Sequence, residues 1–590
     1  MKDPALLQIA AIPTVGILSQ WIAIRFKFPA ILLLLISGFI VGPVLNILNP
    51  DAIMGDVLYP FISLSVAIIL FEGGLSLRFS ELKGTGKTVT HLIFWGGLIS
   101  WVVISCLAYV ILGFEFRIAI LLGAVLLVSG PTVVTPLLRQ IKLKHSLSSI
   151  LRWEGIIIDP LGASLAVLIF EMIISQHATD AIGAGIMVIV STLLSGIVIG
   201  SIAAIIIIVV FKKQIIPNYL QEALTFILVI SSYACADILQ AESGLLAVTI
   251  MGIILANQEL VAIRHIVSFK ENITVLLISS LFIILAARLE LQSLLDIFNT
   301  QTLLFLICII FLVRPLSVFL STGRSNLHLK EKLFLSALYP RGIVAAAVAS
   351  IFSIRLLDAG FESAALIIPI TFITIIVTVF CYGLMGRPLV NLLGQQRDQQ
   401  GVVIVGAQRW SCLFAKALEL AHVPIVLIDT NIENIISAKE MGLKTKHGSI
   451  LSKKIMDDIE MSSFGKLLCT TSSDETNLLA SIEYCSILNP FNIYRLYPKD
   501  RKKDVFINSQ QGKILFEKGI TSSYINSSLL AGATFKPSTL TDAFTYDDFN
   551  TKYPKALVLC MINTKGRLKF FYDSHTFKPQ AGCIIISLRK

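Results

Sequence analysis

The chain has 590 residues, of which 55% are hydrophobic and only 15% are charged, and its formal net charge is +10. This composition excludes a disordered chain, a fibrous repeat and an ordinary soluble enzyme, since soluble domains carry about 25% charged residues. The chain has nine cysteines and no C-x-x-C pair. This pattern excludes a disulfide-stapled secreted domain and a zinc ribbon.

Long apolar segments fill the chain from Ala5 to about Met385. A helix needs about 20 mainly apolar residues to cross a bilayer. We predict thirteen membrane spans, over residues 5–24, 29–48, 56–76, 90–113, 117–138, 150–175, 182–211, 220–238, 242–258, 272–288, 300–321, 333–353 and 361–386. Charged residues return to ordinary density from about Gln395 onward. The sequence therefore predicts a membrane domain over 1–390 and a linker over 391–400, followed by a cytosolic part.

Basic residues gather in the loops that follow the odd-numbered spans, at Arg25, Lys27, Arg78, Lys83, Lys87, Arg139, Lys142, Lys144, Lys212, Lys213, Arg264, Lys270, Arg324, Lys330, Lys332 and Arg387. Loops rich in Lys and Arg face the cytosol. We therefore predict a bacterial inner-membrane protein with a periplasmic N-terminus and a cytosolic C-terminal domain. The positive net charge is then explained by membrane topology and by attraction to membrane lipid, and it is poor evidence for nucleic-acid binding.

One carboxylate lies deep inside a predicted span. Asp159 follows three isoleucines and precedes Pro160 in the sixth span, where it cannot reach water as a lysine would. An ionisable residue in a membrane centre is costly and indicates function. Such a carboxylate would hold a proton or a monovalent cation, which is the chemistry of an exchanger. The alternative is an aspartate that only bonds a neighbouring helix.

A second carboxylate, Glu154, lies five residues before Asp159. Five residues advance a helix by about 7–8 Å and turn it by about 140° from the first position. The two carboxylates therefore face different neighbours. Arg314 and Arg341 are the arginines inside spans, and Arg341 is the more central. We predict a structural Glu154–Arg341 ion pair; direct binding of the ion by Glu154 is the alternative.

Two predicted spans are interrupted at their middles. The fifth contains Ser129-Gly130-Pro131-Thr132 and the twelfth contains Tyr339-Pro340-Arg341-Gly342. Proline and glycine weaken a helix, and paired interruptions in two halves mark the binding site of many transporters. An offset of seven spans gives the two segments opposite orientations, as an inverted repeat requires. We expect free carbonyls there, with the hydroxyls of Ser129 and Thr132, to bind a cation beside Asp159. Ordinary proline kinks are the alternative.

Four segments together resemble the monovalent cation/proton antiporters, in particular the NhaP-type sodium/proton branch. They are residues 129–138 (SGPTVVTPLL), Glu154 with Asp159, residues 314–317 (RPLS) and Arg341-Gly342. The resemblance implies exchange by an elevator-like or rocking motion between a core and a dimerisation domain, in a homodimer. It implies that the positions of Asp159 and Thr132 bind the ion. This chain has Ile158 where the family usually has Asn or Asp, and Ser129-Gly130-Pro131 where it commonly has Thr-Asp-Pro. A single titrating carboxylate favours one-for-one exchange.

The cytosolic part begins as a Rossmann fold. A buried strand over 401–406 is followed by a helix over 409–421 and a strand over 424–428 that ends at Asp429. An acid at this distance binds a ribose in dinucleotide sites. Only the first glycine of G-x-G-x-x-G is present, at Gly406, and Arg409 is a candidate phosphate contact. A Rossmann domain that binds nothing is the alternative.

The residues of about 400–500 resemble the RCK (TrkA-N) domains of potassium channels and transporters. The resemblance implies a regulatory module that senses an adenine nucleotide or NAD(H), with Asp429 at the ribose. We predict this domain over 401–540 and a small β-rich subdomain over 541–590, with strands over 556–562, 568–572 and 583–588.

The predicted function is a secondary antiporter, not an enzyme, that exchanges Na⁺ or K⁺ for protons in cytosolic pH and cation homeostasis and requires no cofactor. One alternative is an RCK-regulated potassium efflux channel or transporter, against which the absence of a T-V-G-Y-G-like filter argues. The other is a membrane-bound nicotinamide-dependent oxidoreductase, against which the incomplete glycine motif argues.

Overall fold

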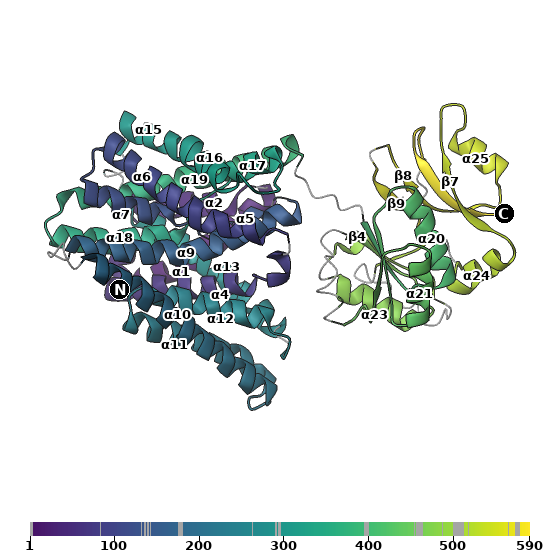
Figure 1. Cartoon of the computed structure of the whole chain (residues 1–590), viewed down its shortest axis with the longest axis horizontal. Helices are drawn as coiled ribbons and strands as arrows, with labels where there is room; N and C mark the ends of the chain where they lie inside the picture. The colour runs from purple at the N-terminus through teal and green to yellow at the C-terminus, as the bar shows by residue number, and fades with distance from the viewer. Residues whose placement is uncertain are drawn as a thin grey trace. The chain divides into compact units, whose positions relative to one another are not determined.

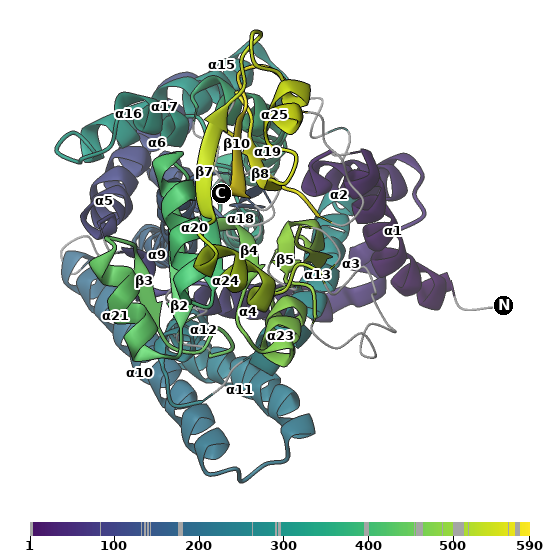
Figure 2. The same ribbon diagram turned by 90° about the vertical axis from the view of Figure 1, so that its right-hand side faces the viewer.

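The computed structural model forms two compact units, Met1–Gln396 and Arg397–Lys590, each of which is described by itself (Figures 1 and 2). It describes residues 4–26, 28–82, 84–130, 133–134, 137–138, 141, 143–174, 181–261, 264–289, 292, 297–394, 401–452, 455, 464–485, 488–498, 512–516, 519–564, 566–572 and 579–590.

The first unit is helical, and described helices lie on each of the predicted spans. They are α1 (Pro4–Phe26), α2 (Ala30–Phe39), α3 (Pro50–Met54), α4 (Leu58–Leu75), α5 (Gly86–His91), α6 (Gly97–Leu112), α7 (Phe116–Leu127), α9 (His145–Ile174), α10 (Ala181–Lys212), α11 (Asn218–Leu239), α12 (Ser243–Asn257), α13 (Arg264–Ala287), α15 (Thr300–Cys308), α16 (Arg314–Ser321), α17 (Leu329–Ser336), α18 (Ile343–Asp358) and α19 (Ile367–Leu392). Among the described residues, eight helices are long and apolar enough to cross a membrane, and four shorter apolar helices accompany them. The prediction of a multi-pass helical protein is confirmed.

The helices of this unit pack in two groups. In one group α4, α10 and α11 surround α12, while α13 packs on α1, α2 and α4. The other group contains α6, α7, α9 and α15–α19, and α9 touches the first group through α10 and α12. Glycines allow the closest approach within the first group, because a Cβ on Gly74 of α4 would lie 2.5 Å from the carbonyl oxygen of Thr249 in α12. Small residues at such contacts are typical of membrane helix packing.

Both predicted interruptions are present as breaks in helices. Helix α7 ends at Leu127, and α17 and α18 are separated by residues 337–342. The two breaks touch, since a Cβ built on Gly342 would collide with the Cα of Gly130. Pro131 and Thr132 lie outside the described residues. The contact between Gly130 and Gly342 places the end of α7 against the start of α18.

The second unit opens with a parallel sheet of six strands in the order β3-β2-β1-β4-β5-β6. The strands are β1 (Gly401–Val405), β2 (Ile425–Asp429), β3 (Thr445–His447), β4 (Phe464–Cys469), β5 (Ile493–Arg495) and β6 (Lys513–Ile514). This is the order of a Rossmann sheet. The helices α20 (Arg409–Leu420), α21 (Ile432–Glu440) and α23 (Asp474–Tyr484) connect its strands. A parallel α/β domain after the membrane part is therefore confirmed.

An antiparallel sheet of four strands completes the unit, in the order β7-β10-β8-β9. Its strands are β7 (Thr534–Thr539), β8 (Leu557–Ile562), β9 (Leu568–Phe570) and β10 (Ile584–Arg589), and it is accompanied by α24 (Ser522–Leu530) and α25 (Tyr546–Lys552). Its β7 precedes residue 541, the predicted start of the β-rich part. One apolar cluster joins both sheets, because Trp410 and Phe414 of α20 are buried with Phe570 and Ile586.

Candidate functional site: the crossing of two broken helices

The central carboxylate faces the break at the end of α7. Gly155, Asp159 and Gly162 are spaced i, i+4 and i+7 along α9 and so share one face of the helix. A Cβ on Gly162 would lie 2.7 Å from the side chain of Val128, and one on Gly155 would lie 3.8 Å from the carbonyl oxygen of Ser129. Both flanking glycines therefore border the break, and Asp159 between them is directed to the same place.

Asp159 is completely buried, at 0% exposure. Neither of its carboxylate oxygens has a hydrogen-bond partner among the described residues. A buried carboxylate without partners is strongly unfavourable as a bare anion. This arrangement suits a group that holds a proton or a monovalent cation.

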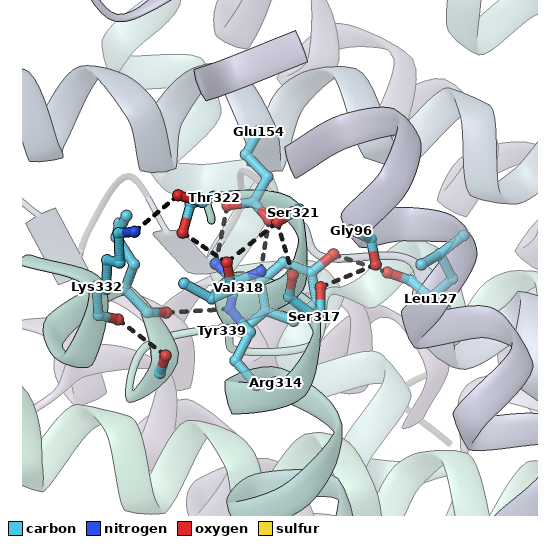
Figure 3. A network of polar contacts seen from close by, with 12 residues as sticks. Gly96, Leu127, Glu154, Arg314, Ser317, Val318, Ser321, Thr322, Lys332 and Tyr339 are labelled. Carbon is cyan, nitrogen blue, oxygen red and sulfur yellow. Dashed lines mark hydrogen bonds and ion pairs between the residues drawn. The ribbon is translucent and has the colours of Figure 1, made fainter. Parts of the chain in front are cut away.

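Glu154 is bound by Arg314, so the predicted Glu154–Arg341 ion pair is wrong. The Arg314 guanidinium donates through Nη1 to Oε1 and through Nη2 to Oε2 of Glu154, the latter at 2.9 Å (Figure 3). Both residues are buried, at 1% and 2% exposure. Two parallel bonds from one guanidinium use both carboxylate oxygens, which is the strong geometry for such a pair. The five-residue offset turns Glu154 toward α16 and away from the break.

Arg341 has a different role, because it lies at the carboxyl end of α7. Its Nη1 donates to the carbonyl oxygen of Leu127 at 3.2 Å, and its backbone N–H donates to the Thr378 hydroxyl at 3.4 Å. Leu127 is the last residue of α7, whose final carbonyls lack helical partners. The guanidinium thus satisfies one of them and opposes the negative end of the helix dipole.

Arg314 makes the equivalent contact at the other break. Its Nε donates to the carbonyl oxygen of Leu335 at 3.0 Å, near the carboxyl end of α17. Each interrupted helix pair therefore has a buried arginine at the end of its first half. In the sequence Arg314 is the less central of the two in-span arginines, and neither carbonyl contact was predicted. The available signal was that each interrupted span has a half-helix that ends just before its proline and glycine, and such an end has free carbonyls that a buried arginine can bind.

The remaining predicted site residues divide into two groups. Ser129 is buried at the break, and Gly130 and Gly342 form the contact of the two breaks. Pro340 borders a small hollow with Pro29 and Val133. Thr132 and Pro131 lie outside the described residues, so their predicted roles stay predictions. The described residues contain no group of three or more His, Cys, Asp or Glu side chains that could hold a transition metal.

The predicted nucleotide residues gather at the carboxyl edge of the parallel sheet. Asp429 ends β2, and its Oδ2 accepts from the backbone N–H of Ala407 at 2.7 Å and from Nδ2 of Asn434 at 2.9 Å. Gly406 begins the turn after β1 with φ +102°, and a Cβ there would lie 3.0 Å from the backbone nitrogen of Thr471. The acid and the glycine thus shape one turn before α20.

Arg409 begins α20, and its exposed side chain borders a pocket of about 470 Å³ between α20, α24 and β7. The turn residue Gln408 accepts through Oε1 from the Ser522 hydroxyl at 3.0 Å, and that hydroxyl accepts from Nε1 of Trp410 at 3.1 Å. The turn at the start of α20 is therefore fastened to α24.

Comparison with known proteins supplies further findings. The family model described as sodium/hydrogen exchanger, transmembrane, matches residues 10–392, and that for the TrkA-N domain matches residues 402–503. The chain is 31% identical over 353 residues to Na(+)/H(+) antiporter 1 of Methanocaldococcus jannaschii, covering 58% of this chain and 82% of that protein. It is 25% identical over 394 residues to the K(+)/H(+) antiporter NhaP of Alkalimonas amylolytica, covering 66% of each.

The structure of the sodium proton antiporter MjNhaP1 from Methanocaldococcus jannaschii at pH 8 is similar to the first unit. The match has a TM-score of 0.58 and 26% sequence identity, and it covers 66% of this chain and 99% of that chain.

Proposed function

The chain belongs to the sodium/hydrogen exchanger family and is a cation/proton antiporter, and we propose that Asp159 is the group at which cation and proton compete. As a transporter the chain is not an enzyme, and neither the channel nor the oxidoreductase alternative is retained. The observation that carries the proposal is the buried Asp159 carboxylate, which faces the crossing of two broken helices without a hydrogen-bond partner among the described residues.

The transported cation is Na⁺ or K⁺. Relatives that are 31% and 25% identical to the chain are named Na(+)/H(+) and K(+)/H(+) antiporters, respectively, so the likeness supports both ions. The ligands we assign are the carboxylate of Asp159, the hydroxyls of Ser129 and Thr132, and carbonyls freed by the break. Glu154 is engaged by Arg314 and supports the site without binding the ion. One titrating carboxylate gives one-for-one exchange.

The test uses inside-out membrane vesicles that contain the full chain and a pH-sensitive dye. Addition of Na⁺, K⁺ or Li⁺ should dissipate an imposed proton gradient in the wild type. Asp159→Asn should abolish the response to every ion, because an amide can neither exchange a proton nor balance a cation. Transport by Asp159→Asn at the wild-type rate would refute the assignment.

Asp237→Asn is the matched control. Asp237 lies near the end of α11, and its Oδ1 accepts from the backbone N–H of Glu242 at 2.7 Å. An asparagine keeps this acceptor, so transport should continue. Comparing the three cations in the same vesicles measures selectivity directly.

We propose thirteen spans arranged as inverted repeats, with the N-terminus in the periplasm and the TrkA-N domain in the cytosol of a bacterial cell. We assign a membrane domain to residues 1–390, a regulatory domain to 401–540 and a β-rich subdomain to 541–590. During exchange, helices α6, α7, α9 and α15–α19 move as one group relative to the group around α12 and α13. The group around α12 and α13 forms the homodimer contact within the membrane lipid.

The regulatory domain senses an adenine nucleotide or NAD(H), with Asp429 at the ribose and Gly406 and Arg409 beside the phosphates. The support is the Rossmann strand order and the position of these residues at the carboxyl edge of the sheet. Ligands bind at this edge in doubly wound folds, where the strand order reverses. The antiporter requires no cofactor for exchange itself.

A further inference from the structure

Tyr339 lies in the break between α17 and α18, with only 5% of its surface exposed. Two buried guanidinium groups lie over its ring. The Cζ atom of Arg314 is 4.1 Å from the ring centroid, and that of Arg341 is 4.7 Å away. A tyrosine ring attracts a cation to its face, and the attraction is stronger where water is excluded. One ring therefore interacts with both arginines of the site.

The hydroxyl of the same residue reaches the end of α7. Tyr339 donates to the carbonyl oxygen of Leu127 at 3.1 Å (Figure 3). Nη1 of Arg341 donates to the same oxygen at 3.2 Å. Two donors thus use both lone pairs of one orphan carbonyl. The contact joins the break in one helix pair to the end of α7 in the other.

The ring also touches the helix that contains the central carboxylate. Tyr339 is buried in a small apolar cluster with Leu127 and with Ile158, the residue directly before Asp159. A change in the position of the ring would therefore alter both the end of α7 and the turn of α9 that presents Asp159.

We propose that Tyr339 is a positioning residue of the exchange site: it holds Arg341 on the Leu127 carbonyl and thereby fixes the break that faces Asp159. Arg341 has few other restraints, because its Nε has no hydrogen-bond partner among the described residues. Arg341 and Arg314 are like charges over one ring, and their repulsion would displace the less restrained of the two. The ring and the shared carbonyl oppose that displacement. This inference rests on the proposed role of Asp159.

The test measures the half-saturating Na⁺ or K⁺ concentration and the maximal rate in vesicles, each normalised to the amount of folded exchanger. Tyr339→Phe keeps the ring and removes the hydroxyl, and should raise the half-saturating concentration roughly fivefold, as expected for one lost hydrogen bond. Tyr339→Leu removes both contacts and should raise it by more than about tenfold. The graded order of the two variants is the central expectation.

The control pair is Tyr233→Phe and Tyr233→Leu, at a buried tyrosine of α11 in the other helix group. These variants should keep the wild-type half-saturating concentration even where the amount of folded protein falls. If both Tyr339 variants also keep the wild-type value, and lose only protein, the residue is merely structural and the inference fails. Failure of the proposed role of Asp159 would be recognised separately, because Asp159→Asn would then still transport ions in the same assay.

Discussion

The Glu154–Arg314 pair offers a quantitative test of the site. Glu154→Leu would leave the Arg314 guanidinium buried at 2% exposure, with the Leu335 carbonyl and the Tyr339 ring as its remaining partners among the described residues. Removing one partner of a buried ion pair costs about 3–5 kcal/mol, because the other charge stays uncompensated. Arg314→Met should cost a similar amount, since it also removes the donor to the Leu335 carbonyl.

The double variant Glu154→Leu/Arg314→Met removes both charges and should cost much less than the sum of the two single variants. Well-packed apolar residues can replace a buried ion pair at little cost. We expect a coupling free energy above about 2 kcal/mol from the double-mutant cycle. The assay is the thermal unfolding of the purified exchanger in detergent. A loss of about 3 kcal/mol should lower Tm by roughly 4 °C, because the unfolding entropy of a unit as long as Met1–Gln396 is large.

The matched cycle combines Glu154→Leu with Arg341→Met. Arg341 donates to the Leu127 carbonyl and has no hydrogen bond to Glu154, so the coupling should stay below about 1 kcal/mol. A larger coupling for Arg341 than for Arg314 would refute the assignment of the partners. Both cycles contain Glu154→Leu, so any effect of this substitution on the unfolded state enters both coupling free energies alike.

Three further predictions concern the contact of the two breaks and the second unit. Gly342→Ala should reduce both folded protein and transport, because its Cβ would collide with Gly130 and overpacking costs about 1–3 kcal/mol; normal yield and transport would contradict this close contact. Burial raises the pKa of the Cys469 thiol to about 12. Burial, with a smaller effect of Asp429, raises that of Cys412 to about 11. Both thiols stay protonated in the folded chain, whereas an unfolded thiol ionises at pH ~8.5. Their contribution to the free energy of unfolding should therefore be complete below pH ~8.5 and disappear as the pH rises to ~11–12. Iodoacetamide should therefore label both thiols slowly at pH 8, and fast labelling of the folded chain would count against their burial. Calorimetry of the full chain with ATP, ADP, NAD⁺ or NADH should give saturable heat that Asp429→Asn weakens; flat titrations would favour a purely structural domain.

The membrane architecture could be predicted because its signals are local. Runs of about 20 apolar residues locate the helices, and Ser129-Gly130-Pro131 and Pro340 with Gly342 mark positions where proline and glycine favour a break. The Rossmann strands followed likewise from short buried runs that end at Gly406 and Asp429. The beginning of the antiparallel sheet was harder to locate, because β7 is mainly polar and contains Pro537.

Partners across the site could not be predicted, because they depend on distances between helices. Position along the membrane normal favoured Arg341 as the partner of Glu154, yet the direction in which each arginine leaves its helix decides the contact. Arg314 reaches Glu154 from α16, while Arg341 is held at the end of α7. Tyr339 carries no signal in the sequence, since an aromatic residue in a span is usually a packing residue. Its proposed function depends on two arginine side chains and one backbone carbonyl, which come from distant segments.

The buried charges around the crossing support the proposal that Asp159 takes a proton or a monovalent cation. Glu154 and a bare Asp159 are negative, while Arg314 and Arg341 are positive, so these four groups then sum to zero. A proton or a monovalent cation at Asp159 leaves the same charge of plus one, whereas a divalent cation would leave plus two in a region of low dielectric constant. The site therefore presents the same net charge to the surrounding helices whether it holds a proton or a monovalent cation. This equivalence allows the same movement to carry either ligand, and it disfavours divalent cations before any contact distance is considered.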